Sequence, residues 1–432
     1  MPQDAGLIGS YISLGVQALI PIILGSFKSL KTPDATIKKR KLARKSQLLD
    51  DEDEEEEEAI EETLTWADSL LFPVFGSIAL LGLFFLIKYV GKEWINTVLG
   101  VYFTGAGMFA VHSTFSSISN WTLRAMGKKP TTYHIRISAG IRQVFHHPTT
   151  LSSLILIPIS IILPLLYIPL GRPYILSNIL ALSLSTATLA LLKLDSFLTA
   201  FVLLGVLLVY DIFWVFATPV MVTVAKSIDA PIKILSPKSS ILNGTPNDFT
   251  MLGLGDIVIP GLVIALCLRF DLSRYSKFNP DQEITNKSKF SKPYFITAII
   301  SYIIGLTITI IVMHTFKAAQ PALLYLSPAC TLGPLLIASI RGELRDLWQW
   351  SDSPNEEDVK KLIDETIEAP SEAAMKARAE AKATDVEIET ENQDDPQVNG
   401  TTLIEEDDNW MTSGVVSPDE GKARKRKGGK RK

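Results

Sequence analysis

Two aspartates lie inside long apolar runs of the chain, where a charged group is costly. Asp211 lies in FLTAFVLLGVLLVYDIFWVF, and Asp256 follows Gly253, Leu254 and Gly255 in MLGLGDIVIPGLVIALCLRF. Each run has about 20 mainly apolar residues, which is the length that a helix needs to cross a bilayer. An ionisable side chain at that depth is expensive and usually functional. Two of them in consecutive runs predict a pair that works together.

Two carboxyl groups that face each other can carry out acid–base chemistry. The sequence places Asp211 near the bilayer midplane and Asp256 about two turns into the next span, and we expect the two helices to be antiparallel neighbours. Like charges a few ångström apart do not both ionise easily, so such a pair holds one proton between its members. In an aspartic protease the ionised carboxylate takes a proton from water, and the protonated one donates to the peptide carbonyl.

Other functions remain open on the spacing of the acids alone. A proton-coupled transporter or channel uses intramembrane carboxylates in a similar way. A non-catalytic factor that binds membrane spans for quality control is a third interpretation. The residues around the two acids must therefore decide between them.

The neighbours of the two acids suit a site that a substrate can enter. Gly253 and Gly255 leave no side chain beside Asp256, so a substrate backbone could approach it closely. Small residues of this kind also allow tight helix packing. Tyr210 could donate a hydrogen bond to a carboxylate or to a substrate, or it could fill a helix interface. A substrate helix hides its carbonyls in its own hydrogen bonds, so it must be locally unwound before cleavage.

The distribution of apolar residues predicts an all-α polytopic membrane protein. Of the 432 residues, 47% are hydrophobic, and they gather into long runs separated by charged blocks. We predict nine transmembrane helices, at residues 6–27, 69–90, 95–118, 151–170, 174–194, 197–224, 250–270, 294–316 and 321–340.

The same pattern divides the chain into a membrane core and charged segments. Residues 1–27 hold the N-terminus and the first span, and residues 69–345 form the core, with the two aspartates on spans 197–224 and 250–270. The loop 28–68 contains the run DDEDEEEEEAIEE, whose like charges repel, so we expect it to be disordered. The tail 346–432 is acid-rich, short of aromatics and basic at its end, and we expect disorder there also.

The basic residues predict the orientation in the membrane. The loops that follow the first, third and seventh spans are richer in lysine and arginine than the alternate loops, and such loops face the cytosol. We therefore expect a lumenal N-terminus and a cytosolic C-terminus. On this topology Asn243 is the one lumenal residue in a glycosylation sequon, which makes it a candidate acceptor.

Three motifs resemble those of the intramembrane aspartyl proteases related to presenilin. The first is Tyr210-Asp211 in LVYDIFWVF, the second is the Gly-x-Gly-Asp pattern that ends at Asp256, and the third is a Pro-Ala-Leu motif at the start of the last predicted span. The stretches VMVTVAKSIDAPIK, LCLRFD and IVMHTFKAAQPALLYLSPAC are similar to signal peptide peptidase more than to presenilin. One departure is Ala217-Thr218-Pro219, where relatives often have Gly-Thr followed by Asn or Asp. We expect Pro219 to kink the end of its span.

The resemblance implies which residues form the site. Asp211 and Asp256 would be the catalytic pair, and Pro321, Ala322 and Leu323 would pack beside them and help to shape the site. From the residues alone, Pro321 indicates only the start of a helix, where the missing N–H costs nothing.

The resemblance also implies substrates, partners and location. It implies an enzyme of the endoplasmic reticulum membrane that cleaves signal-peptide remnants and type II membrane proteins, whose N-termini are cytosolic, within the bilayer. Membrane quality-control proteins and a second copy of the chain are plausible partners from the family. No metal or organic cofactor is implied, because His134, His146 and His147 lack accompanying zinc ligands at a suitable spacing. Nothing in the sequence indicates nucleic-acid binding.

Overall fold

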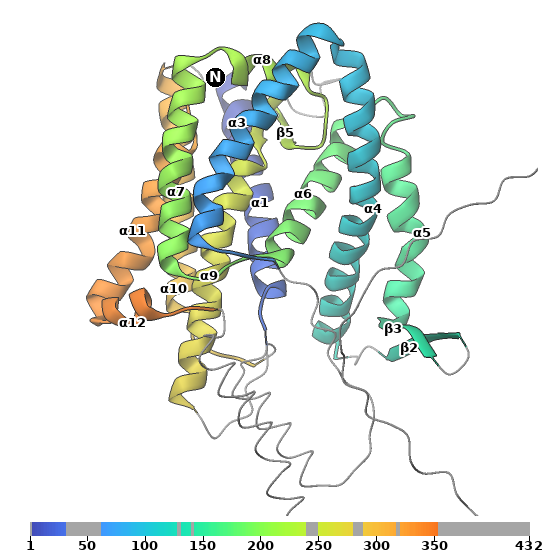
Figure 1. Ribbon diagram of the computed structural model, residues 1–432, viewed down its shortest axis with the longest axis vertical. Helices are drawn as coiled ribbons and strands as arrows, with labels where there is room; N and C mark the ends of the chain where they lie inside the picture. The colour runs from blue at the N-terminus through green and yellow to red at the C-terminus, as the bar shows by residue number, and fades with distance from the viewer. Residues whose placement is uncertain are drawn as a thin grey trace, which may run out of the picture. The chain divides into compact units, whose positions relative to one another are not determined.

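The computed structural model describes residues 2–31, 62–127, 131–139, 142–238, 249–279, 288–316 and 320–352. All of these residues belong to one structural unit, whose helices stand side by side (Figure 1). The acidic run of the predicted loop 28–68, most of the predicted tail 346–432 and Asn243 lie outside the described residues.

The described chain is mainly helical, as the sequence predicts. Seven of its helical segments are long and apolar enough to cross a membrane, and one further helix is apolar but shorter. The helix that contains Asp256 is not among them, because it carries charged residues near both ends. The predicted number of nine spans therefore stays a prediction. The helices are α1 (Pro2–Lys28), α3 (Trp66–Tyr89), α4 (Lys92–Ala125), α5 (Leu151–Leu165), α6 (Tyr174–Leu191), α7 (Phe197–Ile212), α8 (Val220–Ser227), α9 (Gly255–Phe278), α10 (Pro293–Phe316), α11 (Leu323–Arg341) and α12 (Leu344–Gln349).

Short strands, which the sequence does not predict, pair at both ends of the helices. The first pair is parallel and joins segments about 130 positions apart, and the other two pairs are antiparallel hairpins. In each pair, backbone N–H and C=O groups that lie outside the helices form hydrogen bonds with each other. The pairs are β1 (Glu62–Leu64) with β4 (Leu192–Leu194), β2 (Thr132–Ala139) with β3 (Arg142–Thr150), and β5 (Lys233–Pro237) with β6 (Phe249–Gly253).

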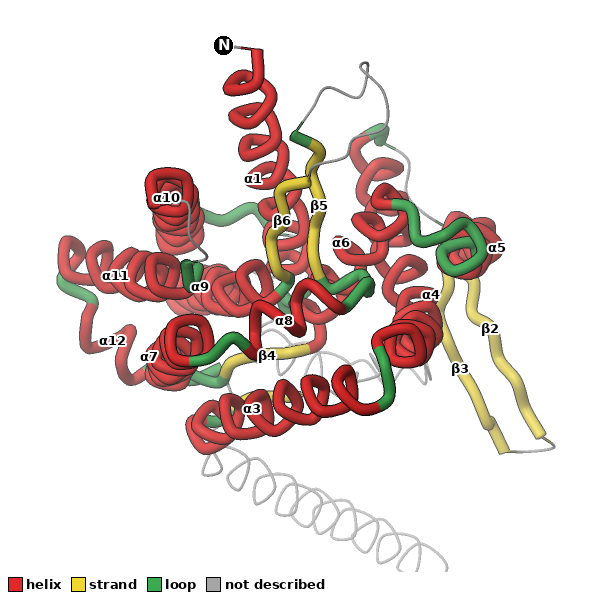
Figure 2. Tube along the Cα trace, turned by 90° about the horizontal axis from the view of Figure 1, so that it is seen from above, coloured by secondary structure: helices red, strands yellow, loops and turns green. Residues whose placement is uncertain are grey.

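Helix α9 forms the centre of the packed core. Seen from above, it lies among α1, α7, α10 and α11 (Figure 2), and its residues from Pro260 to Leu272 are all buried. Gly261 permits this packing, because a Cβ at this position would lie 2.9 Å from a methyl carbon of Leu189 on α6. Helix α3, in contrast, exposes large apolar side chains such as Phe75 and Ile78, as a lipid-facing helix does.

Buried charges tie the C-terminal half of α9 to distant segments. The Arg269 guanidinium donates to the carbonyl of Leu194 over 3.1 Å and lies 2.9 Å from the carboxylate of Asp352, beyond α12. The Asp271 carboxylate accepts the backbone N–H groups of Tyr294 and Phe295, at the start of α10. Buried charges need such partners, since an unpaired one is strongly destabilising. The described core thus continues past the predicted boundary at residue 345.

Candidate active site

Asp211 lies in the last turn of α7, directly before a break in the helix. A π-helical segment, η1, follows at Phe213–Ala217, and Thr218 then adopts an extended conformation with φ −139° and ψ 145°. Pro219 explains the break, because a proline pushes the residue before it out of the helical region. The predicted span 197–224 is therefore divided between α7, η1 and α8, and the break exceeds the expected kink.

Asp256 lies in the first turn of α9, so the expectation that it lies two turns into a helix is wrong. The residues before it form β6, which pairs with β5, and the N–H of Leu254 donates to the carbonyl of Ile232 over 3.0 Å. Pairing in the hairpin thus takes the backbone groups that a longer helix would use. A short apolar run such as MLGLG fits either structure on periodicity alone.

The structure brings the two aspartates together, although 44 residues separate them in the sequence. Helices α7 and α9 contact each other, and they carry Asp211 in the last turn of α7 and Asp256 in the first turn of α9. Asp211 is buried, with 5% of its surface exposed, whereas Asp256 is half-buried. Two carboxyl groups on neighbouring helices can share one proton between them.

The Pro-Ala-Leu segment meets Asp211 through its backbone. The N–H of Leu323, the first residue of α11, donates to Oδ2 of Asp211 over 3.2 Å. The first N–H groups of a helix have no partner within that helix. The start of α11 therefore supplies a donor that fixes the orientation of a carboxylate 112 positions earlier in the sequence.

The two predicted glycines leave space beside Asp256. A Cβ at Gly253 would meet one atom within 4 Å, which is Oδ2 of Asp256 at 3.5 Å, and a Cβ at Gly255 would only touch Ile259, its own helical neighbour, at 4.0 Å. Neither glycine is thus needed for close packing between helices. The arrangement favours an open approach to the carboxylate over the packing alternative.

The Tyr210 hydroxyl lies at the interface between α7 and α3. A Cβ at Gly76 on α3 would lie 3.4 Å from the Tyr210 hydroxyl, and the rings of Tyr210 and Trp214 have centroids 6.3 Å apart. The Trp214 indole donates to the hydroxyl of Ser77, also on α3, over 3.2 Å. The sequence predicts two roles for Tyr210, a hydrogen-bond donor at the site or a packing residue. Its position favours the packing role.

Tyr302 of α10 lies beside Asp256, which the sequence did not indicate. Its hydroxyl donates to the backbone carbonyl of Asp256 over 3.4 Å, and its side chain is completely buried. The sequence contained one indirect signal of such a contact. Pro260, four residues after Asp256, lacks the backbone N–H that would donate to the Asp256 carbonyl in a regular helix.

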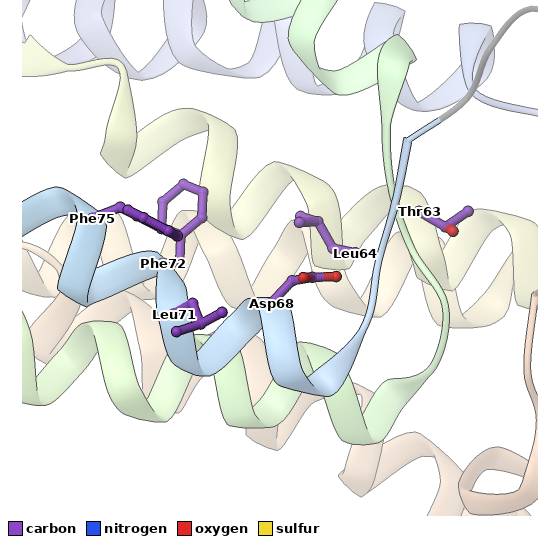
Figure 3. Close-up of a pocket in the computed structure, with 6 residues that line it drawn as sticks. All are labelled: Thr63, Leu64, Asp68, Leu71, Phe72 and Phe75. Carbon is purple, nitrogen blue, oxygen red and sulfur yellow. The ribbon is translucent and has the colours of Figure 1, made fainter. Parts of the chain in front are cut away.

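A crevice with a volume of about 420 Å³ lies between β1 and the start of α3 (Figure 3). The Asp68 carboxylate at this crevice accepts the N–H and the hydroxyl of Thr65, at 3.0 and 2.7 Å, in a capping box. Asp68 therefore has a structural role at the helix start. In the part of the chain that the structure describes, no group of metal-binding side chains could hold an ion. The crevice is lined by Thr63, Leu64, Asp68, Leu71, Phe72 and Phe75.

Comparisons with known proteins match this chain to one family. The family model described as "Signal peptide peptidase" matches residues 55–354. The chain is 36% identical to the signal peptide peptidase of Mus musculus over 382 residues, which cover 87% of this chain and 92% of that protein. It is also 36% identical to the Homo sapiens signal peptide peptidase, over 81% of this chain and 85% of that protein.

The comparisons also give two further similarities. A probable intramembrane protease of Schizosaccharomyces pombe is 37% identical over 67% of this chain and 84% of its own length. A solved structure of a presenilin family intramembrane aspartate protease aligns with a TM-score of 0.41 and 14% identity, over 76% of this chain and 99% of that one. A TM-score of this size does not by itself indicate a shared fold.

Proposed function

The chain belongs to the signal peptide peptidase family and is an intramembrane aspartic endopeptidase, and we propose that Asp211 and Asp256 are its catalytic pair. The observation that carries this assignment is the meeting of three distant motifs. Asp211 lies next to the start of α11, where Leu323 donates to it, and its helix α7 contacts α9, which carries Asp256. The relatives are named as proteases, which supports the enzyme over the transporter and the quality-control factor.

The proposed mechanism uses a water between the two carboxyl groups. The ionised carboxylate takes a proton from the water while its partner donates a proton to the carbonyl oxygen of the scissile bond. The product of this step is a tetrahedral diol, which then breaks down with proton transfer to the leaving nitrogen. The N–H of Leu323 holds the Asp211 carboxylate during these steps, and the space beside Gly253 admits the substrate backbone.

We infer that the substrates are signal-peptide remnants and type II membrane segments, whose N-termini face the cytosol. This rests on the names of the relatives and on the sequence motifs. The segment must be unwound near the scissile bond, because a membrane helix uses its own carbonyls in hydrogen bonds.

One apolar segment, inserted in either direction, tests this substrate class. The segment carries lysines before its apolar run in one version and after it in the other, which reverses its orientation. Microsomes that contain the protein are expected to cleave the version with a cytosolic N-terminus, inside the apolar run, as read by mass spectrometry. Equal cleavage of the reversed version would contradict the substrate class, and cleavage of neither would contradict the activity.

We further propose that the protein lies in the endoplasmic reticulum membrane with its N-terminus in the lumen. In Figure 1 the C-terminal ends of α1, α4 and α9 lie at the same end as α12, and each of these three helices leads into a basic segment in the sequence. The three helix ends that lead into basic segments thus lie at one end of the structure, which supports a cytosolic assignment for that end.

Protease protection tests this orientation. A protease added to sealed microsomes is expected to remove an epitope at the C-terminus, and a protected epitope would contradict the proposal. If Asn243 is lumenal and used, a glycosidase changes the mobility of the wild type but not of Asn243→Gln.

A further inference from the structure

We propose that Tyr302 is a positioning residue for Asp256, because it replaces a backbone hydrogen bond that Pro260 removes from the first turn of α9. In an α-helix the carbonyl of each residue accepts the N–H four positions later. The residue four positions after Asp256 is Pro260, which has no N–H. The carbonyl of Asp256 therefore lacks its ordinary helical donor.

The Tyr302 hydroxyl is placed to supply that donor from another helix. It lies 3.4 Å from the carbonyl oxygen of Asp256, and the Tyr302 side chain has 0% exposure. A buried tyrosine hydroxyl needs a hydrogen-bond partner, as does a buried carbonyl.

Close packing of α10 against α11 fixes the position of Tyr302. A Cβ at Gly305 would lie 2.9 Å from Cβ of Ala329, and a Cβ at Gly333 would clash with the side chain of Ser301, the neighbour of Tyr302. The same α11 begins with Leu323, whose N–H holds Asp211. The α10–α11 pair thus carries one donor for each aspartate, to the backbone of Asp256 and to the carboxylate of Asp211.

A second contact ties the other end of α10 to α9. The Asp271 carboxylate accepts the N–H of Phe295 over 3.0 Å and that of Tyr294 over 3.4 Å. Helix α10 is therefore held to α9 near the start of α10 and again at Tyr302. Two fixed points limit the rotation of the first turn of α9, which is the turn that carries Asp256.

A double-mutant cycle tests this inference, which rests on the proposed role of Asp256. The four enzymes are the wild type, Tyr302→Phe, Pro260→Ala and the double variant. Tyr302→Phe is expected to lower kcat by about 3- to 10-fold with KM unchanged, because one hydrogen bond is lost and no substrate contact is. Pro260→Ala restores a backbone N–H at position 260, so Tyr302→Phe should then cost less than about 2-fold. An equal loss in both backgrounds, or no loss in the wild-type background, would overturn the inference.

Tyr294→Phe is the matched control. Tyr294 is also on α10 and completely buried, but its hydroxyl donates to Glu343 over 2.7 Å, away from Asp256. Its effect should be the same with Pro260 or Ala at position 260. If Pro260→Ala does not fold, Tyr302→Phe and Tyr294→Phe are compared directly. A loss of kcat in Tyr302→Phe alone is then the expected result. Similar losses of kcat in both variants would overturn the inference. Activity that persists in Asp256→Asn would instead refute the proposed function itself.

Discussion

Asp211→Asn and Asp256→Asn are each expected to lower kcat/KM by about 10³-fold or more. Asparagine keeps the size and shape of aspartate, but it cannot exchange a proton with water or with the peptide carbonyl. Its carbonyl oxygen can still accept the N–H of Leu323, so the contact between α7 and α11 survives in Asp211→Asn. The measurement is the rate of product formation from a labelled signal-peptide segment by purified protein in detergent.

The double variant should be no less active than either single variant. Residues that act as a unit lose their effect together, so their losses do not add. Asp229→Asn is a control, since Asp229 is an exposed acid between α8 and β5. We expect near-normal activity from it and similar thermal unfolding for all variants. Cleavage that survives in Asp211→Asn or Asp256→Asn at the rate of the wild type would contradict the assignment of the pair.

Gly253→Val is expected to lower kcat/KM by about 10²-fold without loss of folding, since small displacements at a reacting centre have effects of this size. Even the Cβ of an alanine would lie 3.5 Å from Oδ2 of Asp256, in ordinary contact, and the branches of valine fill more of the space that a substrate backbone needs. Valine suits a strand, and Gly253 is the last residue of β6. Gly253→Ala should therefore have a smaller effect, of about tenfold or less.

Gly82→Val provides the control for this series. Gly82 lies on α3, where a Cβ would meet no atom within 4 Å. Both substitutions add the same apolar volume, but the substitution at Gly82 does so away from the two aspartates. We expect Gly82→Val to keep its activity. An active Gly253→Val enzyme would show that substrates do not approach Asp256 from this side.

The sequence by itself determined the kind of protein and indicated the residues that we propose carry its chemistry. Long apolar runs predict membrane helices because the length and apolarity of a segment are local properties. The cost of a carboxylate in such a run singled out Asp211 and Asp256. The basic loops predicted an orientation, which awaits the protease-protection measurement, and three short motifs indicated the family.

Only the tertiary structure decided how these residues are held. It placed a strand before Asp256, brought the N–H of Leu323 to Asp211, and set Tyr302 against the carbonyl that Pro260 leaves without a helical donor. It also paired Arg269 with Asp352, across 83 positions of the sequence. These partners lie far apart in the chain and follow no local period. Periodicity records which face of a segment is buried, whereas the identity of a distant donor depends on how whole helices pack.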